Sequence, residues 1–467
     1  MMKLWAHWLT AVMQLRSSCS RCRTFLWLIT CAAGMSVRID LLGVTSIVRA
    51  FGLQESCYDR ILDFFHGSGL NLEKLTTIWT RIVLKIFPKV LRVNGRLLLV
   101  GDGIKIPKEG KKMPAVKGIH QESESNSKPS FIMGHSFQAV GILAGGLLNT
   151  VFAVPLVSRI HEGIVFSNRD KRTLLDKMAA LTESLKIEEP FYFIADAYYA
   201  TGKIVKKLLA KGNHLISRVK SNAVAYYPVM EKSTGRGRPK KYGEKIKLRK
   251  LFDNPDIMET APSPIYGETN TKLRFRSVDL IWRPVGFIVR FVAVIHPVRG
   301  KCILMSTDLN LLSLEIIRLY GLRFKIELSF KQAIRTLGTY AYHFWMKKMK
   351  PIKRFAGDQY LHKKTDAYRQ AVRRKIDAYH RFVQIGLIAQ GLLQYLSASF
   401  PQLVFSSFGS WFRTIRSDVA PSEQVTAIAL RNTLPEFLSD SSPNSILKKF
   451  ITERIDLNRI EGLRLIA

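Results

Sequence analysis

The chain has 467 residues, of which 47% are hydrophobic and 26 are Phe, a composition that excludes a disordered or fibrous protein. It carries 72 Lys and Arg residues against 36 Asp and Glu residues, a formal net charge of +36. Such self-repulsion indicates a polyanionic partner, and nucleic acid is the first candidate. Five cysteines are too few and odd in number for a secreted disulfide framework, which favours a reducing compartment.

Residues 1–90 are predicted to be helical. Apolar residues recur at spacings of three and four in the segments VTSIVRAFGL and YDRILDFFHG, the pattern of helices that bury one face. This part of the chain is therefore expected to form a helical N-terminal region.

Residues 91–222 change to short apolar runs that alternate with helical segments. The run LLLV leads into Gly101, Asp102 and Gly103, and the run FYFIA leads into Asp196. Helices are expected over residues 170–185 and in GKIVKKLLAKG, after Asp196. Such alternation predicts an α/β fold, a mixed sheet flanked by helices.

Residues 134–158 contain no Asp, Glu, Lys or Arg and are long enough to cross a membrane as a helix. Gly145, Gly146, Asn149 and Pro155 interrupt the run, and the sequence on either side is rich in β-branched and aromatic residues. Two adjacent buried strands are the prediction. The alternative, a membrane protein, predicts solubility that depends on detergent.

Residues 223–310 are predicted to be a β-rich insertion, because Pro and Gly separate alternating segments such as KLRFRSVDLIW and GFIVRFVAVIHPV. Trp282 in this insertion is either a base-stacking wedge or a core residue. Helices return in residues 311–345 and continue through a basic C-terminal region, residues 346–467.

Asp102 and Asp196 each follow an apolar strand and are flanked by small residues. Ligands gather at the carboxyl ends of strands in an open sheet, so two carboxylates delivered there can share a divalent cation. The alternative is a pair of ordinary turn or helix-capping aspartates.

Residues 318–334 are predicted to form one docked helix. At 100° per residue, Tyr320, Arg323, Glu327 and Lys331 share a face. An apolar stripe lies beside that face and consists of Leu319, Leu322, Ile326 and Phe330. The alternative is a surface helix with ordinary ion pairs from Glu327 to Arg323 and Lys331.

Taken together, the order of these elements resembles the DDE transposases of bacterial insertion sequences, specifically the insertion-sequence-four group with its Y-x2-R-x3-E-x6-K signature. The resemblance covers roughly residues 40–345 and includes the β-rich insertion between the last two acids. One position departs from the signature, because Ile334 stands where Lys is expected. Lys331 and Arg335 are both near enough in sequence to supply that cation.

The resemblance implies an RNase H-like catalytic core in which Asp102, Asp196 and Glu327 are catalytic and bind two Mg²⁺ or Mn²⁺ ions. Carboxylate oxygens are the ligands that these ions prefer. The implied reaction is metal-dependent cleavage at the transposon ends followed by strand transfer to target DNA, which is cut-and-paste transposition.

The resemblance also implies the partners. Tyr320, Arg323 and Lys331 would contact double-stranded DNA, both terminal inverted repeats and target DNA, and residues 1–90 would recognise the ends. A dimer is expected in the DNA complex, in the cytoplasm of a bacterium and associated with the nucleoid. A non-catalytic basic DNA-binding protein from a decayed element is the alternative function.

Two basic segments are further candidates for DNA contacts. The segment GRGRPKKYGEK is similar to an AT-hook core, which lies in a narrow minor groove, and it contains Arg236, Arg238, Lys240 and Lys241. A solvated basic loop is the alternative for this segment. The second cluster is expected to face phosphates and consists of Lys347, Lys348, Lys350, Lys353 and Arg354.

Overall fold

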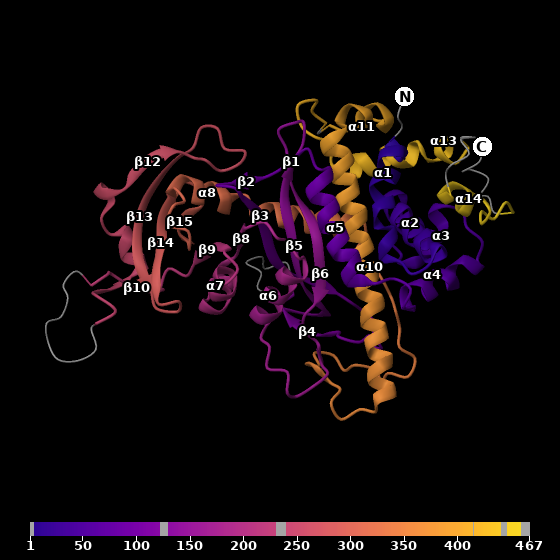
Figure 1. Ribbon diagram of the computed structural model, residues 1–467, viewed down its shortest axis with the longest axis horizontal. Coiled ribbons are helices and arrows are strands. Elements are labelled where there is room, and N and C mark those ends of the chain that lie inside the picture. Colours follow the sequence, from indigo (N-terminus) through magenta and orange to yellow (C-terminus); the bar gives the residue numbers. More distant parts are fainter. Residues whose placement is uncertain (1–3, 122–128, 230–239, 414, 440–445, 459–467) are drawn as a thin grey trace.

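The computed structural model describes residues 4–121, 129–229, 240–413, 415–439 and 446–458. It is a mixed α/β structure, as predicted. Helices from both ends of the chain lie on one side of a large sheet, and the sheet continues outward into the β-rich insertion (Figure 1).

Five strands form the centre of the sheet in the order β6-β5-β3-β8-β9. β5 is antiparallel to both of its neighbours, β6 and β3, whereas β3, β8 and β9 run parallel to one another. Their bounds are β3 (Arg96–Pro107), β5 (Phe131–Gly145), β6 (Val151–Ile160), β8 (Phe191–Ala195) and β9 (His214–Val219).

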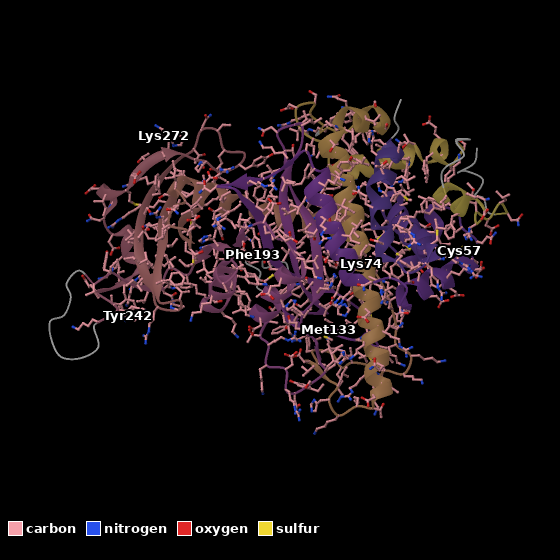
Figure 2. The ribbon with its side chains drawn as sticks, viewed as in Figure 1. Cys57, Lys74, Met133, Phe193, Tyr242 and Lys272 are labelled. Atoms are coloured by element: carbon pink, nitrogen blue, oxygen red, sulfur yellow. The ribbon has the colours of Figure 1, made fainter. Side chains whose placement is uncertain are left out.

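The β-rich insertion extends this sheet, because β15 pairs antiparallel with β9 and leads on to β14 and β13. Its strands are β10 (Val224–Tyr226), β11 (Lys245–Lys247), β12 (Glu259–Pro262), β13 (Lys272–Trp282), β14 (Phe287–His296) and β15 (Gly300–Ser306). Tyr242 marks its outer end (Figure 2). The β-rich character predicted for residues 223–310 is confirmed.

Short strands complete the sheets: β1 (Lys89–Val90), β2 (Arg92–Val93), β4 (Lys117–His120), β7 (Ile164–Val165) and β16 (Gln359–Tyr360). The 3₁₀ helices are η1 (Gln14–Ser18), η2 (Ala197–Tyr199), η3 (Leu248–Phe252) and η4 (Pro255–Ile257).

The N-terminal helices are α1 (Leu4–Met13), α2 (Cys22–Val37), α3 (Val44–Ala50), α4 (Ser56–His66) and α5 (Leu72–Ile86). Four more flank the sheet: α6 (Leu174–Ser184), α7 (Gly202–Leu209), α8 (Ser313–Gly321) and α9 (Phe324–Arg335). The C-terminal helices are α10 (Asp366–Ser399), α11 (Pro401–Phe408), α12 (Glu423–Asn432), α13 (Leu434–Ser439) and α14 (Ile446–Thr452).

Helices from the two ends of the chain pack against one another. The indole N–H of Trp5 in α1 donates to the carbonyl of Leu430 in α12 at 3.0 Å, and Arg431 donates to the carbonyl of Val37 at 2.6 Å. The long helix α10 runs between these two groups of helices and the sheet (Figure 1). The N-terminal and C-terminal helices thus share one hydrophobic core.

The charge-free run at residues 134–158 forms two antiparallel strands, β5 and β6, as predicted. Both are almost entirely buried, which explains why the run lacks charged side chains. In the part of the chain that the structure describes, no helix combines the length and the apolar character needed to cross a membrane.

Alternate residues along the central strands enter two different cores, because successive side chains of a strand point to opposite faces. Leu98 and Val100 of β3 and Ile194 of β8 pack beneath α8 and α9. Leu99 and Phe193 pack on the opposite face, in the core shared with α6, α7 and α10. A side chain's position along its strand therefore decides which helices it meets.

Candidate active site

Asp102 and Asp196 lie side by side at the point where the parallel strands β3 and β8 separate. The last parallel pair joins Gly101 to Ala195, and each aspartate is the next residue along its strand. Asp102 continues the alternate row of Leu98 and Val100, so it belongs to the face that α8 and α9 cover. The register thus brings two acids that are distant in sequence to one edge and one face of the sheet.

The expectation that β3 ends at Asp102 is wrong. The strand runs on to Pro107 and pairs with β5 throughout, with Asp102 opposite Ala139. What ends at Asp102 is the pairing with β8, because β8 stops at Ala195 while β5 is long enough to continue. Asp102 therefore lies in a strand that is paired on one side, while on the other side the pairing with β8 ends one residue before it.

The two glycines beside Asp102 differ in what they do. A Cβ added to Gly101 would lie 2.3 Å from the ring of Phe193, a side chain at the centre of the molecule (Figure 2). A Cβ on Gly103 would meet no heavy atom closer than 3.7 Å, and the Gly103 N–H donates to the Asp102 carboxylate at 2.7 Å. Gly101 is needed for close packing of the two strands, and Gly103 supplies a hydrogen bond.

Asp196 follows β8 directly and caps the 3₁₀ helix η2. Its Oδ1 accepts from the N–H of Tyr198 at 3.1 Å, and its carbonyl accepts from the hydroxyl of Ser217 at 2.8 Å. Asp196 is thus a capping aspartate and also the neighbour of Asp102, so the two roles considered for this residue are compatible.

The predicted helix over residues 318–334 is wrong in one respect, because two helices cover this stretch. α8 ends at Gly321 and α9 begins at Phe324. Between them the N–H of Arg323 bonds to the carbonyl of Tyr320, three residues back, and both intervening residues keep helical torsion angles. This tightened turn is the physical reason for the interruption. The predicted apolar stripe remains, since Leu319, Leu322 and Ile326 are buried and Phe330 packs against them.

Arg323 joins two of the three candidate acids. Its Nη1 lies 2.8 Å from Oδ2 of Asp102, and its Nη2 lies 2.7 Å from Oε1 of Glu327. The Arg323 and Asp102 side chains are only 18% and 19% exposed, whereas Glu327 is 56% exposed. The contact with Asp102 is therefore the better shielded of the two and the stronger.

The charges at this site perturb one another. Burial raises the pKa of Asp102 to about 6; Asp196 and Glu327 raise it too, while Arg323 and the Gly103 N–H lower it. Burial lowers the pKa of Arg323, but the neighbouring acids outweigh that effect and the pKa is raised. All three acids thus lie within electrostatic range of one guanidinium.

Tyr320 lies on the same edge. Its ring centroid is 5.9 Å from the guanidinium carbon of Arg323, and its pKa is raised by burial and by Asp196 and Cys302, although Arg323 and Arg218 lower it. The predicted grouping of Tyr320, Arg323 and Glu327 therefore persists across the interruption between α8 and α9.

Arg218 was missed by the sequence analysis. In the pairing of β8 with β9, Ala195 lies opposite Ser217, so Arg218 is the next residue along and the neighbour of Asp196. The row across the three parallel strands is Asp102, Asp196 and Arg218. A signal was present in the sequence, because the charged residue Arg218 follows the short run HLIS just as Asp196 follows FYFIA.

The donor set of this site suits a divalent metal ion, but in this structure Arg323 pairs with two of the three acids. Within the described ranges, no three Asp, Glu, His or Cys side chains stand close enough to hold one ion. Asp102 and Glu327 each turn a carboxylate oxygen toward Arg323. Three carboxylates are the ligand set that Mg²⁺ or Mn²⁺ prefers, and the raised pKa of Asp102 marks a carboxylate that gains from a further cation. The chemistry of the donors therefore fits such an ion, although the described side chains are not close enough to share one in this structure.

The remaining predicted DNA contacts lie elsewhere on the surface. Lys331 is exposed on α9, one turn after Glu327. The carboxylate of Glu327 pairs with Arg323, on the preceding turn. Lys240 and Lys241 are exposed at the outer end of the insertion, whereas Arg236 and Arg238 lie outside the described residues. Arg335 is exposed as well, and so is every member of the second basic cluster: Lys347, Lys348, Lys350, Lys353 and Arg354.

Trp282 is a core residue in this structure. It lies at the end of β13 opposite Phe287, is 5% exposed and belongs to the larger hydrophobic core. Of the two roles considered for it, the core role agrees with this burial.

A known protein family matches part of the chain. Residues 161–339 match the family described as the transposase DDE domain. The matched stretch includes Asp196, Arg218, Tyr320, Arg323 and Glu327, and it begins after Asp102. No curated protein matches the chain.

The match and the strand arrangement together define an RNase H-like fold, a mixed sheet flanked by helices. They support a DDE transposase, that is, an enzyme of the nuclease and transposase class that acts on DNA. The family generally uses divalent metal ions.

Proposed function

We propose that the chain is a cut-and-paste DNA transposase of the insertion-sequence-four type, with Asp102, Asp196 and Glu327 as its catalytic acids. One observation carries the proposal: the strand register aligns Asp102 with Asp196, and Arg323 connects Asp102 to Glu327. The proposal is supported by three acids that are far apart in sequence but act electrostatically on the same guanidinium.

The three carboxylates would together hold two Mg²⁺ or Mn²⁺ ions. When bound, such ions supply an activated nucleophile at neutral pH and neutralise charge on the phosphate being cleaved. Asp102 must be ionised to take part, and its pKa of about 6 leaves most of it ionised at neutral pH.

Arg323 and Tyr320 would position the DNA. A guanidinium makes forked hydrogen bonds to phosphate as readily as to carboxylate, so Arg323 can exchange Asp102 for a phosphate oxygen when DNA arrives. Tyr320, beside Arg323, would donate its hydroxyl to a phosphate or stack on a base. Lys331, one turn beyond Glu327 on α9, would contact the backbone nearby.

The substrates would be double-stranded DNA of two kinds, the terminal inverted repeats of the element and the target. The net charge of +36 supports a polyanionic substrate. Residues 1–90 would read the ends, with Lys240, Lys241, Arg236 and Arg238 as added backbone contacts. Two ends are joined in one event, so a dimer is proposed in the DNA complex. Short inverted repeats flanked by a direct duplication around the coding sequence would identify the substrate.

The test is nicking of a plasmid that carries the coding sequence with its flanking DNA. The protein should nick this plasmid with Mg²⁺ or Mn²⁺ and not with a chelator. Asp102→Asn, Asp196→Asn and Glu327→Gln should each abolish nicking and leave DNA binding intact.

A matched control is available for these variants. Asp279 also pairs with an arginine, Arg290, at 2.8 Å, but in the β-rich insertion, so Asp279→Asn should keep full activity. If any of the three acid variants nicks as well as the wild type, those acids do not form the catalytic site. DNA binding without any nicking by the wild type would favour the non-catalytic alternative.

A further inference from the structure

A strongly basic pocket opens beside the candidate active site. It has a volume of about 600 Å³ and lies where β9 ends, between η3 and the start of β15. The lining includes four cationic side chains, Arg218, Arg249, Lys250 and Lys301.

The pocket exists because β9 and β15 differ in extent. The last residue of β9, Val219, lies opposite Ile303, whereas β15 begins at Gly300. Lys301 and Cys302 therefore project past the end of β9. The end of β9 is also the edge that carries Asp102 and Asp196, since β3, β8 and β9 are parallel.

Two residues connect the pocket to the candidate active site. Arg218 lines the pocket and is the strand neighbour of Asp196. Cys302 also lines the pocket, and both it and Arg218 act electrostatically on Tyr320. Arg218 and Cys302 pair with strand positions on the face that carries the acids, whereas Lys301 belongs to the row of Ile303 on the opposite face. The pocket therefore extends around the end of β9 from the face of the acids to the other face.

Among the described residues, the cations of the pocket lining outnumber the acids. Asp253 is the one acidic residue of its lining, and none of the four cations forms an ion pair with any residue that the structure describes. The ammonium of Lys301 lies 5.4 Å from the ring centroid of Phe252. Cations gathered in a concave site raise the local concentration of anions.

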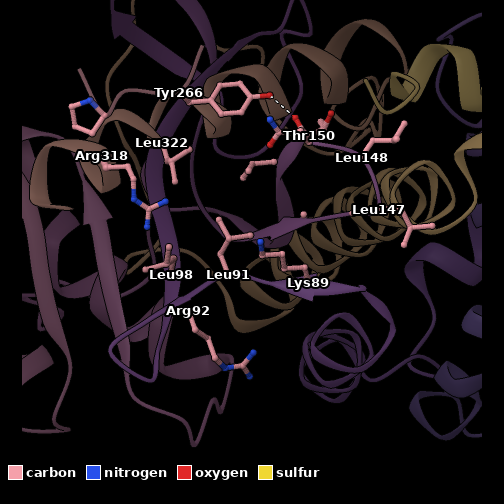
Figure 3. Close-up of a pocket in the computed structure, with 15 residues that line it drawn as sticks. Lys89, Leu91, Arg92, Leu98, Leu147, Leu148, Thr150, Tyr266, Arg318 and Leu322 are labelled. Carbon is pink, nitrogen blue, oxygen red and sulfur yellow. Dashed lines mark hydrogen bonds between the residues drawn. The ribbon is translucent and has the colours of Figure 1, made fainter. Parts of the chain in front are cut away.

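A second cavity provides a comparison at the opposite edge of the sheet. It has a volume of about 580 Å³, and Lys89, Arg92 and Arg318 line it (Figure 3). There Arg92 pairs with Glu189 at 2.8 Å, and Arg318 pairs with Glu315. Protein carboxylates thus neutralise two arginines at that edge, whereas the four cations of the basic pocket have no such partner among the described residues.

We propose that the basic pocket binds the phosphate backbone of the DNA strand that leaves the active site past Tyr320. This rests on the proposed function for the direction in which the strand runs. The volume of the pocket suits a short stretch of one strand and is too small for a duplex. Arg218 would hold the phosphate nearest the acids, and Arg249, Lys250 and Lys301 the following ones.

The first test measures DNA binding by fluorescence anisotropy in the presence of a chelator, which keeps it independent of cleavage. The triple variant Arg249→Gln/Lys250→Gln/Lys301→Gln should bind a short duplex with a single-stranded extension at least about tenfold more weakly. The slope of log Kd against log salt should fall by about two, because three cations no longer neutralise phosphates and each contributes about 0.7 to the slope on a single strand.

A control variant removes the same number of charges from the other edge of the sheet. Lys89→Gln/Lys206→Gln/Lys211→Gln changes exposed lysines on β1 and around α7, ahead of the start of β9. Its affinity and salt slope should stay close to those of the wild type. Equal losses in the two triple variants would overturn the proposal, because they would reflect net charge alone.

The second test needs no substitution. Cys302 lines the pocket, so bound DNA should slow its alkylation by a maleimide several-fold, as measured by mass spectrometry of the wild-type protein. Inorganic phosphate at the same phosphate concentration should protect it far less. Equal protection by phosphate would identify a small-anion site, and unchanged alkylation with DNA would show that the strand lies elsewhere; either result contradicts the proposal.

The proposed function and the proposed role of the pocket can each be refuted without the other. Loss of DNA affinity in the triple variant supports the pocket even if the acid variants still nick DNA. Conversely, acid variants that abolish nicking leave the pocket proposal to be decided by binding and alkylation alone.

Discussion

Replacing Arg323 with Gln should raise the pKa of Asp102 well above its value of about 6. Burial, Asp196 and Glu327 raise the pKa of Asp102, whereas Arg323 and the N–H of Gly103 lower it. Arg323 is the closest positive charge, 2.8 Å away, and both side chains are mostly shielded from water. Removing an arginine at this distance typically raises a carboxyl pKa by about 1–3 units, or ~1.4–4 kcal/mol.

The assay is a carbon-13 NMR titration of aspartate side-chain carboxyls in selectively labelled protein, with Asp102→Asn to assign the resonance. Arg318→Gln is the control, since Arg318 pairs with Glu315 on α8 and should leave the Asp102 titration unchanged. A pKa for Asp102 in the Arg323→Gln variant that stays at or below the wild-type value would refute the electrostatic coupling described here.

Gly101→Ala should lower the free energy of unfolding by about 1–3 kcal/mol, because the added Cβ would lie 2.3 Å from the ring of Phe193. Gly103→Ala is the control and should not lower it. Thermal unfolding of the two variants checks this prediction, and equal melting temperatures would contradict it. Burial lowers the pKa of Lys108 to about 7 in the folded protein. Between pH 7 and the ordinary lysine pKa of 10.5, Lys108 is therefore protonated in the unfolded state and mostly neutral in the folded state. Its contribution therefore increases stability as pH rises from 7 toward 10.5, by at most about 1.4 kcal/mol per unit. Lys108→Met should flatten that slope in melting temperatures measured between pH 7 and 9, and an unchanged slope would count against the shift.

The sequence predicted the parts of the site that depend on local periodicity. Apolar runs of strand length ending in Asp102 and Asp196 were recognisable because the strands are buried on both faces. The apolar stripe beside Glu327 was equally clear, since Leu319, Leu322 and Ile326 pack on the sheet. Both patterns can be recognised in a single sequence because each buried position requires an apolar side chain.

Features that depend on strand extent were missed. The alternation of Ile104 and Ile106 with Lys105 continues β3 beyond Asp102, but the Gly-Asp-Gly segment was interpreted as its end. The break between α8 and α9 leaves Leu322 and Arg323 in helical torsions, so it disturbs neither the apolar pattern nor the propensities from which a helix is predicted.

Contacts between distant segments could not be predicted from local patterns. The packing of α1 on α12 through Trp5 and Leu430 joins opposite ends of the chain, and nothing in either helix specifies that partner. Arg218 and the basic pocket likewise depend on which strand lies beside β8, a question of topology that one sequence does not answer.

The central claim is that Asp102, Asp196 and Glu327 form one metal site. Electron paramagnetic resonance of free Mn²⁺ measures its binding to the purified protein without reference to DNA cleavage. The wild type should bind Mn²⁺, and each of Asp102→Asn, Asp196→Asn and Glu327→Gln should weaken that binding at least about tenfold, because each removes one charged ligand. Wild-type affinity in any one of these variants would show that its carboxylate is not a ligand and would contradict the shared site.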